Sequence, residues 1–474
     1  MDLQKELSAL VSSDRVVNDF DVLEGYSKDL SFVKARMPSV VVYTENKEEV
    51  AAVLKFANEK KVAVTPRSSV VSFYGAGIPS QGGIILDLSR MKKIIAINKA
   101  DRRVQVEPGV TYAEIVEPLA KEGMYVSTPL FPHPLKSVVT SAMENEVLAN
   151  PKFEYNEVFQ SSEMILPTGE LFYTGTAIAP GFVGRGIPEL TIPSNRLFKG
   201  AQGTLGVITY AFLKLEYLPP MDKLFFIAFD KLGGAEEFIY KLARLNLGNE
   251  CFILNNLDIA AIFAENDEDV VALSEEVPAY VLAIVLSGGQ YLAEEKISYE
   301  QEYLHDLAKE CNLNLQLRMP GVTGGATRMQ SLLRKPWDRD VYWKFRYKGA
   351  CQDLFFITTM EKAEAFTAAV KGIADANQIG SVGVYVQPIE RGRVVQCAYH
   401  FYYDPENQIQ AQKVQKAWLE GSSAVLKMGG FITNPYGAQA DMVYSLAGRY
   451  SSLLKVVKEA FDPNGIMNPG KLCF

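Results

Sequence analysis

Gly200-Ala-Gln-Gly-Thr-Leu-Gly-Val-Ile-Thr209 places three glycines within seven residues, directly before an apolar run from Leu205 to Leu215 that predicts a strand. Glycine allows positive φ and lets the backbone approach a planar ligand closely. A loop that opens straight into a strand presents main-chain N–H and C=O groups, which suit the polar edge of a flavin or adenine ring. Taken alone, the stretch fits a tight turn with a glycine bulge equally well.

Composition narrows the class of protein. A chain of 474 residues with 48% hydrophobic content is too long for one core and predicts two or three domains. The net charge is −8 and no block of lysine or arginine occurs, so nucleic acid is not an expected partner. The N-terminal segment lacks the apolar core of a signal peptide, and no run of eighteen apolar residues occurs. We therefore expect a soluble, cytoplasmic protein without a membrane span.

The cysteines and histidines argue against a metal centre. The five cysteines are odd in number, widely spread and never arranged as C-x-x-C: Cys251, Cys311, Cys351, Cys397 and Cys473. This spacing argues against a disulfide framework, a zinc site and an iron–sulfur cluster. The only histidines are His133, His305 and His400. Three scattered histidines do not predict a metal site, so we expect none.

A β-α-β unit is predicted near the N-terminus, with strands over 40–43 and 62–65 and a helix over 46–59 between them. The loop that follows, Pro66 to Gly77, is dense in hydroxyl residues and comes where a strand has just ended, which is where ligands bind in open α/β units. Its serines, its main-chain N–H groups and Arg67 suit phosphate oxygens. A solvated surface loop held by side-chain turns is the alternative interpretation.

The rest of the chain divides at Pro219-Pro220. Before this point, short strands with one interposed helix favour an α+β fold over a doubly wound sheet. After it, strands and long helices alternate, which predicts a second α/β module. The last segment carries two turn signals in tandem, Asp462-Pro-Asn-Gly-Ile-Met-Asn-Pro-Gly470.

Taken together, these blocks resemble the FAD-linked oxidases of the vanillyl-alcohol oxidase and p-cresol methylhydroxylase type, a family that includes D-lactate and glycolate dehydrogenases. The resemblance covers nearly the whole chain. Six motifs carry it in order: Tyr26 to Asp29, the run 40–67, Gly82 to Met91, Val106 to Thr111, Gly200 to Thr209, and Asp462 to Lys471.

The resemblance implies an α+β fold in three parts: a FAD-binding domain of two subdomains over 1–219, a cap domain with an antiparallel sheet over 220–425, and a C-terminal segment, 426–474, that returns to the FAD side. The cofactor would be FAD, held non-covalently because the 66–77 loop contains no histidine. The residues implied around it are Arg67, Ser68, Ser69, Val70, Val71, Ser72, Gly75, Gly109, Thr140, Ser141, Gly203, Gly206, Val207 and Ile208.

The chain also departs from both known substrate types of this family. Hydroxyacid enzymes have three consecutive glycines where this chain has Ser68-Ser69-Val70, and Gly-Glu-His-Gly where it has Asn434-Pro-Tyr-Gly437. Of their metal-binding histidine strand only His400 is present. Phenol-oxidising enzymes share Tyr74-Gly75, but Gly430-Phe431 stands in place of their Tyr-Arg pair.

Three side chains are candidates for catalysis. Tyr436 occupies the place of the hydroxyacid-enzyme histidine, and an arginine nearby would lower its pKa enough for a base. Tyr74 is the second candidate, and a satisfied core phenol is the alternative for both tyrosines. His400 is the third, because strand alternation places it with Ala398 and Tyr402 on one face, although a lone histidine in a strand is more often structural. Four arginines are further candidates for binding an anionic substrate: Arg328, Arg334, Arg346 and Arg391.

These features predict a FAD-dependent dehydrogenase that oxidises a small alcohol or 2-hydroxy acid, such as D-lactate or glycolate, by hydride transfer to the flavin N5. Since the chain has no cluster of its own, electrons would pass to a protein partner with iron–sulfur clusters or a second flavin. An oligomer is expected. One alternative is oxidation of a para-substituted phenol, a 4-alkylphenol or 4-hydroxybenzyl alcohol, at the benzylic carbon. Another is a non-catalytic flavin-binding subunit of a larger redox complex.

Overall fold

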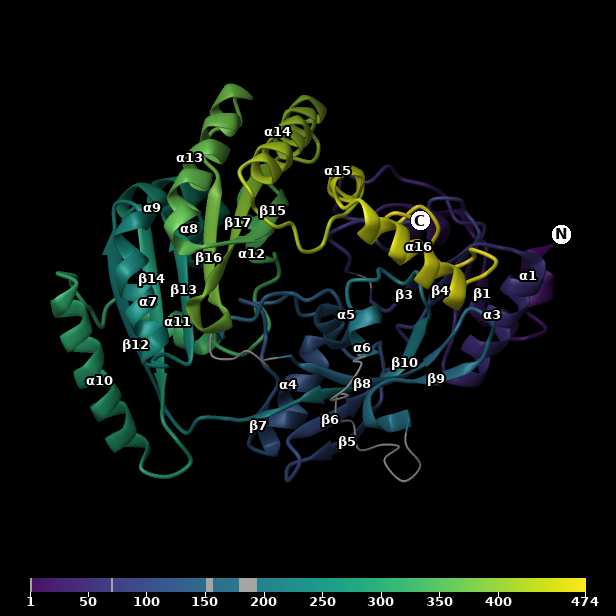
Figure 1. Ribbon diagram of the computed structural model, residues 1–474, viewed down its shortest axis with the longest axis horizontal. Helices are drawn as coiled ribbons and strands as arrows, with labels where there is room; N and C mark the ends of the chain where they lie inside the picture. Colours follow the sequence, from purple (N-terminus) through teal and green to yellow (C-terminus); the bar gives the residue numbers. More distant parts are fainter. Residues whose placement is uncertain (1, 70, 151–156, 179–193) are drawn as a thin grey trace.

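The computed structural model describes residues 2–69, 71–150, 157–178 and 194–474. Val70, one of the predicted cofactor residues, lies outside the described residues. The fold is of the mixed α+β class, as predicted, and it separates into two halves (Figure 1). One half holds both ends of the chain and three of the sheets, and the other is built on one large sheet. Within the described residues no helix is long and apolar enough to cross a membrane.

The first sheet has four strands in the order β1-β2-β4-β3: β1 (Val16–Val17), β2 (Val40–Tyr43), β4 (Ile84–Asp87) and β3 (Val64–Arg67). Strands β2 and β3 both run parallel to β4. The helix α3 (Lys47–Lys60) connects β2 to β3 and buries Val50, Val53 and Leu54 against the sheet. Its first turn is closed by Asn46, whose side-chain oxygen accepts from the Glu49 N–H at 2.9 Å. The predicted β-α-β unit is therefore confirmed.

The second sheet has five strands in the order β5-β6-β10-β8-β9: β5 (Ile94–Asn98), β6 (Arg103–Val106), β10 (Val207–Lys214), β8 (Phe159–Ile165) and β9 (Leu171–Tyr173). All of its neighbours are antiparallel. The glycine-rich stretch leads into β10, which is the central strand. A small pair, β7 (Met124–Tyr125) with β11 (Glu216–Tyr217), adjoins this half. The helices of this half are α1 (Leu3–Leu7), α2 (Phe20–Ser27), α4 (Tyr112–Lys121), α5 (Val138–Met143) and α6 (Asn195–Phe198).

The third large sheet has six antiparallel strands in the order β12-β14-β13-β16-β17-β15: β12 (Asp222–Phe229), β14 (Tyr280–Ser287), β13 (Glu250–Asn255), β16 (Gly383–Ile389), β17 (Val394–Tyr403) and β15 (Ala350–Thr358). One face is covered by α7 (Glu236–Arg244), α10 (Ala293–Glu310), α13 (Met360–Ala376) and α14 (Gln408–Lys427). The other face carries α8 (Asn256–Phe263), α9 (Val270–Glu276), α11 (Gly325–Leu332) and α12 (Trp343–Arg346).

Strand β17 shows how this sheet presents side chains to a site. Cys397, Tyr399 and Phe401 pack under the helices of the first face. Ala398 and His400 point to the opposite face, toward Leu130 and Phe131 of the other half. The alternation read from the sequence is therefore confirmed, and it turns His400 toward the junction of the two halves.

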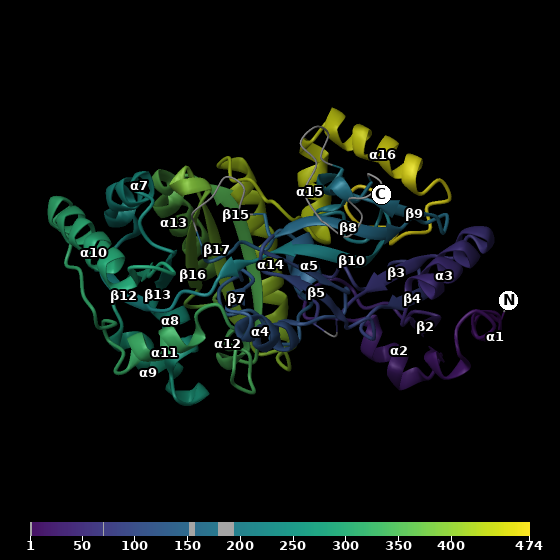
Figure 2. The same cartoon turned by 90° about the horizontal axis from the view of Figure 1, so that it is seen from below.

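The C-terminal segment returns to the first half through α15 (Ala438–Leu446) and α16 (Arg449–Phe461), as both views show (Figures 1 and 2). Met467 forms a parallel bridge with Val64, next to β3. The Asn468 amide donates to the carbonyls of Gln202 at 2.6 Å and Ala76 at 2.9 Å. These contacts tie the 66–77 loop to the Gly200–Thr209 stretch, although the two are far apart in sequence.

Candidate active site

The cofactor cavity lies where the 66–77 loop, the N-terminal part of β10, α5 and the C-terminal segment meet. It encloses about 1000 Å³ of space, counting its open mouth. Eleven of the predicted site residues line it together: Arg67, Ser68, Ser69, Val71, Ser72, Thr140, Gly203, Gly206, Val207, Ile208 and Tyr436.

Three of the implied cofactor residues do not line this cavity. Gly75 belongs to the 66–77 loop, but its N–H is donated to Asp29 at 2.7 Å. Gly109 is a close-packing position, since a Cβ there would lie 2.7 Å from the Leu88 carbonyl oxygen. Ser141 points away from the cavity, accepts from the Tyr112 hydroxyl at 2.8 Å and donates to Glu146.

A second space, the aromatic pocket, adjoins the cofactor cavity and lies between the two halves. It encloses about 860 Å³, counting its mouth. Eight of its lining residues carry aromatic rings: Phe73, Tyr74, His133, Tyr342, Trp343, Phe355, Tyr385 and His400. Its charged lining residues are Lys136, Glu144, Glu146, Lys344 and Asp353. Glu144 lines both spaces, so its side chain stands at their junction.

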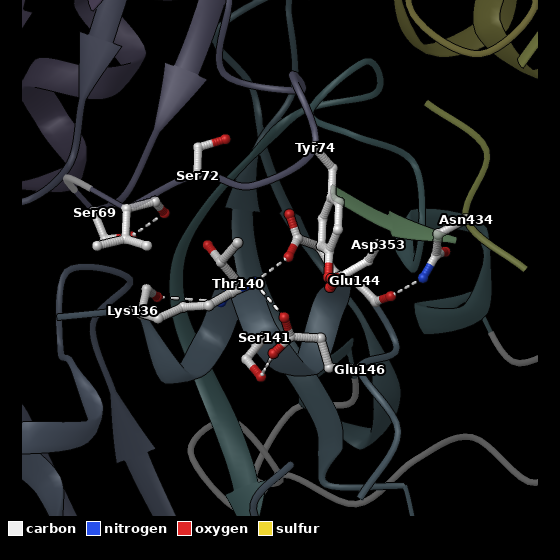
Figure 3. A network of polar contacts seen from close by, with 12 residues as sticks. Ser69, Ser72, Tyr74, Lys136, Thr140, Ser141, Glu144, Glu146, Asp353 and Asn434 are labelled. Carbon is white, nitrogen blue, oxygen red and sulfur yellow. Dashed lines mark hydrogen bonds and ion pairs between the residues drawn. The ribbon is translucent and has the colours of Figure 1, made fainter. Parts of the chain in front are cut away.

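Lys136, Glu144 and Glu146 line the aromatic pocket and form an ion-pair network there (Figure 3). The Lys136 ammonium binds Glu144 at 2.6 Å and also binds Glu146. Burial opposes the charge of Lys136, but the two carboxylates outweigh burial and raise the pKa of Lys136. Burial, with the charge of Glu146 added to it, raises the pKa of Glu144. One cation thus holds two carboxylates together, and Glu144 has more affinity for a proton than an exposed glutamate.

A second network lies on the sheet side of the pocket. Lys344 binds Asp353, and against the effect of burial it keeps the pKa of Asp353 below its usual value. The Tyr74 hydroxyl donates to Asp353 at 3.4 Å. The His400 Nδ1 donates to Asp258 at 2.8 Å. The two networks therefore place carboxylates on both sides of the pocket.

Tyr74 and Tyr436 stack on each other, with ring centroids 4.9 Å apart. Burial raises the pKa of both phenols well above the usual value, and the carboxylates of Asp353 near Tyr74 and Glu144 near Tyr436 add to the effect. The predicted lowering of the Tyr436 pKa by an arginine is therefore wrong, because the neighbours are carboxylates. Both phenols are suited to donate hydrogen bonds and to form a wall of the site.

Comparison with known proteins matches one segment in each half of the chain to a family. Residues 38–175 match the FAD binding domain, and residues 359–472 match the C-terminal domain of FAD linked oxidases. This chain belongs to the FAD-linked oxidases. It is 24% identical to the mitochondrial D-lactate dehydrogenase (cytochrome) of Arabidopsis thaliana, over 98% of this chain and 78% of that protein. It is 22% identical to the glycolate oxidase subunit GlcD of Bacillus subtilis, over 94% of this chain and 91% of that protein.

A solved structure shows the same fold. The 4-ethylphenol oxidase from Gulosibacter chungangensis matches with a TM-score of 0.84 at 20% identity, over 99% of this chain and 96% of that chain. The sequence relatives of this FAD-linked oxidase thus include hydroxyacid enzymes, while a similar fold belongs to a phenol oxidase. FAD is the cofactor of the family. The relatives act on different substrates, so membership of the family does not identify the substrate of this chain.

The cofactor cavity of this FAD-linked oxidase suits FAD. Its polar part carries the hydroxyls of Ser68, Ser69, Ser72 and Thr140 beside Arg67, which suits a diphosphate. Its apolar part suits a ring system, and its lining there is Val139, Met143, Met164, Phe198, Leu205, Val207 and Ile208. A Cβ at Gly203 would lie 2.5 Å from the Pro66 side chain. The backbone at this position therefore packs so closely against Pro66 that a side chain has no room.

The four arginines considered for an anionic substrate do not line the aromatic pocket of this FAD-linked oxidase. Three of them form ion pairs elsewhere: Arg328 with Asp338, Arg334 with Asp222 and Glu250, and Arg346 with Asp267. Phe431, assigned to the place of the phenol-enzyme arginine, is 65% exposed and does not line the pocket either.

Sequence reasoning missed the charged residues of the pocket: Lys136, Glu144, Glu146, Lys344 and Asp353. It also missed Asp258, which binds His400 from outside the pocket lining. The signal that could have found Glu144 and Glu146 was local, because Met143-Glu-Asn-Glu146 directly follows the hydroxyl-rich stretch Ser137 to Ala142. The residues of the sheet side had no such signal. Asp353 lies beside His400 because β15 pairs with β17, and Asp258 reaches His400 from α8.

His133 predicts a pH dependence of stability. Burial, with the charge of Lys136, lowers the pKa of His133 to about 4. The unfolded chain binds this proton near pH 6.5, whereas the folded chain binds it only near pH 4. Protonation therefore favours the unfolded chain. The free energy of unfolding is unaffected by His133 above pH 6.5 and decreases as the pH falls from 6.5 to 4. We expect His133→Asn to flatten the decline of the thermal midpoint between pH 7 and 4.

The exposed His305 provides a matched control for the loss of an imidazole, as His305→Asn. If the thermal midpoint of His133→Asn fell as steeply between pH 7 and 4 as that of the wild type, His133 would not be the group responsible for the decline.

Proposed function

We propose that this FAD-linked oxidase oxidises a neutral aromatic alcohol, an aryl alcohol with its hydroxyl on the carbon next to the ring, to the carbonyl compound. The observation that supports this most directly is the lining of the aromatic pocket. Eight of its lining residues carry aromatic rings, its two lysines are each paired with a carboxylate, and no arginine is among its described lining residues. A substrate carboxylate would meet three carboxylates and two lysines already in ion pairs, whereas a neutral ring would be accommodated.

Glu144 is the proton acceptor in this proposal. Oxidation of the alcohol removes two electrons and two hydrogens, one of which leaves as the hydroxyl proton. Glu144 stands at the junction of the two spaces, and its raised pKa suits the acceptance of that proton. When bound, FAD supplies the acceptor for the electron pair and the other hydrogen. Tyr74 and Tyr436, stacked on each other, form the wall beside Glu144.

The flavin is held non-covalently in this proposal. The described lining of the cofactor cavity contains no histidine or cysteine, and its one tyrosine, Tyr436, stacks on Tyr74. Acid precipitation should therefore release the yellow colour into the supernatant, and a yellow pellet would overturn this point.

A protein partner receives the electrons, so the chain is a dehydrogenase rather than an oxidase. All five cysteines are free and scattered, which leaves the chain without ligands for a cluster of its own. Slow peroxide formation by the isolated chain, with fast transfer to an artificial dye, is the expected result. Rapid peroxide formation would make it an oxidase.

The second candidate substrate is a 2-hydroxy acid, and the sequence relatives favour it. The D-lactate dehydrogenase and glycolate oxidase relatives cover most of the chain. For this substrate Lys136 or Lys344 would have to exchange a protein carboxylate for that of the substrate, which the paired geometry disfavours.

An anaerobic visible spectrum distinguishes these candidates. The purified yellow protein is mixed in turn with benzyl alcohol, 4-hydroxybenzyl alcohol, 4-ethylphenol, D-lactate and glycolate. We expect bleaching of the flavin band with the two aryl alcohols. Bleaching with D-lactate or glycolate alone would replace the proposal by the hydroxyacid reaction. A tightly held flavin that none of them bleaches would support a non-catalytic flavin-binding subunit.

A further inference from the structure

We propose that Trp343 and His400 form a recognition site for one hydroxyl group on the far end of the substrate ring, and that Asp258 positions His400 for this task. The inference rests on the proposed function, because it treats the aromatic pocket as the substrate site. It adds a specific substrate feature, a neutral hydroxyl on the ring.

Trp343 supplies the donor. Its side chain lines the aromatic pocket and is 2% exposed, and its indole nitrogen is buried without a hydrogen-bond partner among the described residues. The other buried tryptophan of this region, Trp337, donates to the Val341 carbonyl at 2.7 Å. A buried N–H that lacks a partner costs stability, so its retention beside a pocket points to a ligand acceptor.

His400 supplies the acceptor. It also lines the pocket, and its ring lies 5.4 Å from that of Trp343 and nearly perpendicular to it. Asp258 accepts from Nδ1 at 2.8 Å, so Nδ1 carries a hydrogen; in the neutral form of the imidazole, which this proposal assigns to His400, Nε2 is then the acceptor nitrogen. The nearest carboxylate oxygen to Nε2, on Asp353, is 3.8 Å away, which is beyond hydrogen-bond distance.

The structure holds Asp258 firmly in this role. Asp258 is fully buried and accepts a second hydrogen bond from the Tyr402 hydroxyl at 2.8 Å. Gly383 makes room for it, since a Cβ at that position would lie 1.9 Å from the Asp258 carboxylate. A donor and an acceptor on two neighbouring rings match a hydroxyl, which can accept from Trp343 and donate to His400 at once. An ether can satisfy only the donor.

The test is a binding series that needs no turnover. Calorimetry on the flavin-loaded protein measures the affinity for phenol, anisole and fluorobenzene, none of which carries an oxidisable alcohol. We expect phenol to bind about tenfold more tightly than anisole, which is the contribution of one hydrogen bond to His400. Equal affinity of wild type for phenol and anisole would overturn the proposal.

Two variants separate the two roles. Trp343→Phe should weaken phenol and anisole alike relative to fluorobenzene, by about tenfold. In Asp258→Asn the amide keeps its oxygen for Tyr402 and donates its N–H to Nδ1, which reverses the tautomer, so the preference for phenol over anisole should vanish. Phenol and anisole affinities unchanged in Trp343→Phe would overturn the donor role, and a preference retained in Asp258→Asn would overturn the positioning role.

Trp337→Phe is the matched control, because Trp337 is equally buried and does not line the pocket. Its affinities should equal those of the wild type, and a loss as large as that of Trp343→Phe would overturn the assignment. The flavin content of each variant shows that the fold is intact. If the aryl alcohols fail to bleach the flavin while this binding pattern holds, the reaction is wrong and the hydroxyl site stands.

Discussion

Gly203→Val is expected to give a protein that folds but purifies without its yellow colour. Gly203 has φ +70°, and an added Cβ would lie 2.5 Å from the Pro66 ring. Both residues line the cofactor cavity, so any movement that relieves the clash reshapes the FAD site. A β-branched residue at positive φ costs about 1–3 kcal/mol before the clash is counted, so the flavin affinity should fall by at least about tenfold. The ratio of flavin to protein absorbance measures the loss.

The matched control for this change is Gly372→Val. Gly372 is exposed on α13, and nothing lies within 4 Å of the position of its Cβ. It should purify as yellow as the wild type. Circular dichroism distinguishes loss of flavin from loss of fold, and Gly203→Ala, which removes the β-branch, provides a milder form of the same change. A Gly203→Val protein with a full complement of flavin would place the cofactor elsewhere.

Glu144→Gln is expected to slow flavin bleaching by an aryl alcohol by about 10²- to 10⁴-fold, because the amide keeps the shape of the side chain and cannot accept a proton. Flavin content should not change, since Gln retains a hydrogen-bond acceptor for Lys136. Anaerobic stopped-flow absorbance at saturating substrate measures the rate. A rate within a few-fold of the wild type would remove Glu144 from the reaction.

Glu146→Gln is the matched control, since Glu146 binds the same lysine and lines the aromatic pocket but not the cofactor cavity. Its bleaching rate at neutral pH should stay close to that of the wild type. The negative charge of Glu146 raises the pKa of Glu144, so its removal should lower that pKa and move the acid limb of the rate profile to lower pH. An acid limb that does not move would contradict the assignment of Glu144 as the titrating group.

The cofactor side of this protein was largely predictable. The 66–77 loop and the Gly200–Thr209 stretch each act through consecutive residues, and eleven predicted residues line the cofactor cavity. The errors there concern direction. Ser141 and Gly75 belong to the right segments, but their side or main chains face Glu146 and Asp29 instead of the cavity. The backbone dihedral angles of single residues decide which way a side chain or an N–H group faces, and the amino-acid composition of a segment does not reveal these angles.

The contacts on the substrate side were mostly not predictable from the sequence, because they join residues far apart in the chain. The sequence placed His400 on the correct face of its strand, because alternation in β17 is a local property. It did not predict that Asp258 binds His400 across 142 residues, or that Tyr74 meets Asp353 across 279. The expected arginine beside Tyr436 was wrong for the same reason, since the nearby charges are Glu144 and Glu146, which follow α5, and Asp29.

The sequence by itself determined the α+β class, the glycine and hydroxyl segments that suit FAD, and the family. Those properties depend on residues close together in the chain, where backbone conformation and hydrogen bonding are set locally. Only the tertiary structure decided that two lysines are paired with carboxylates in an aromatic pocket, and that a buried indole N–H there has no described partner. Ion pairing and burial depend on which segments pack together, so the chemistry of the substrate side arises from packing.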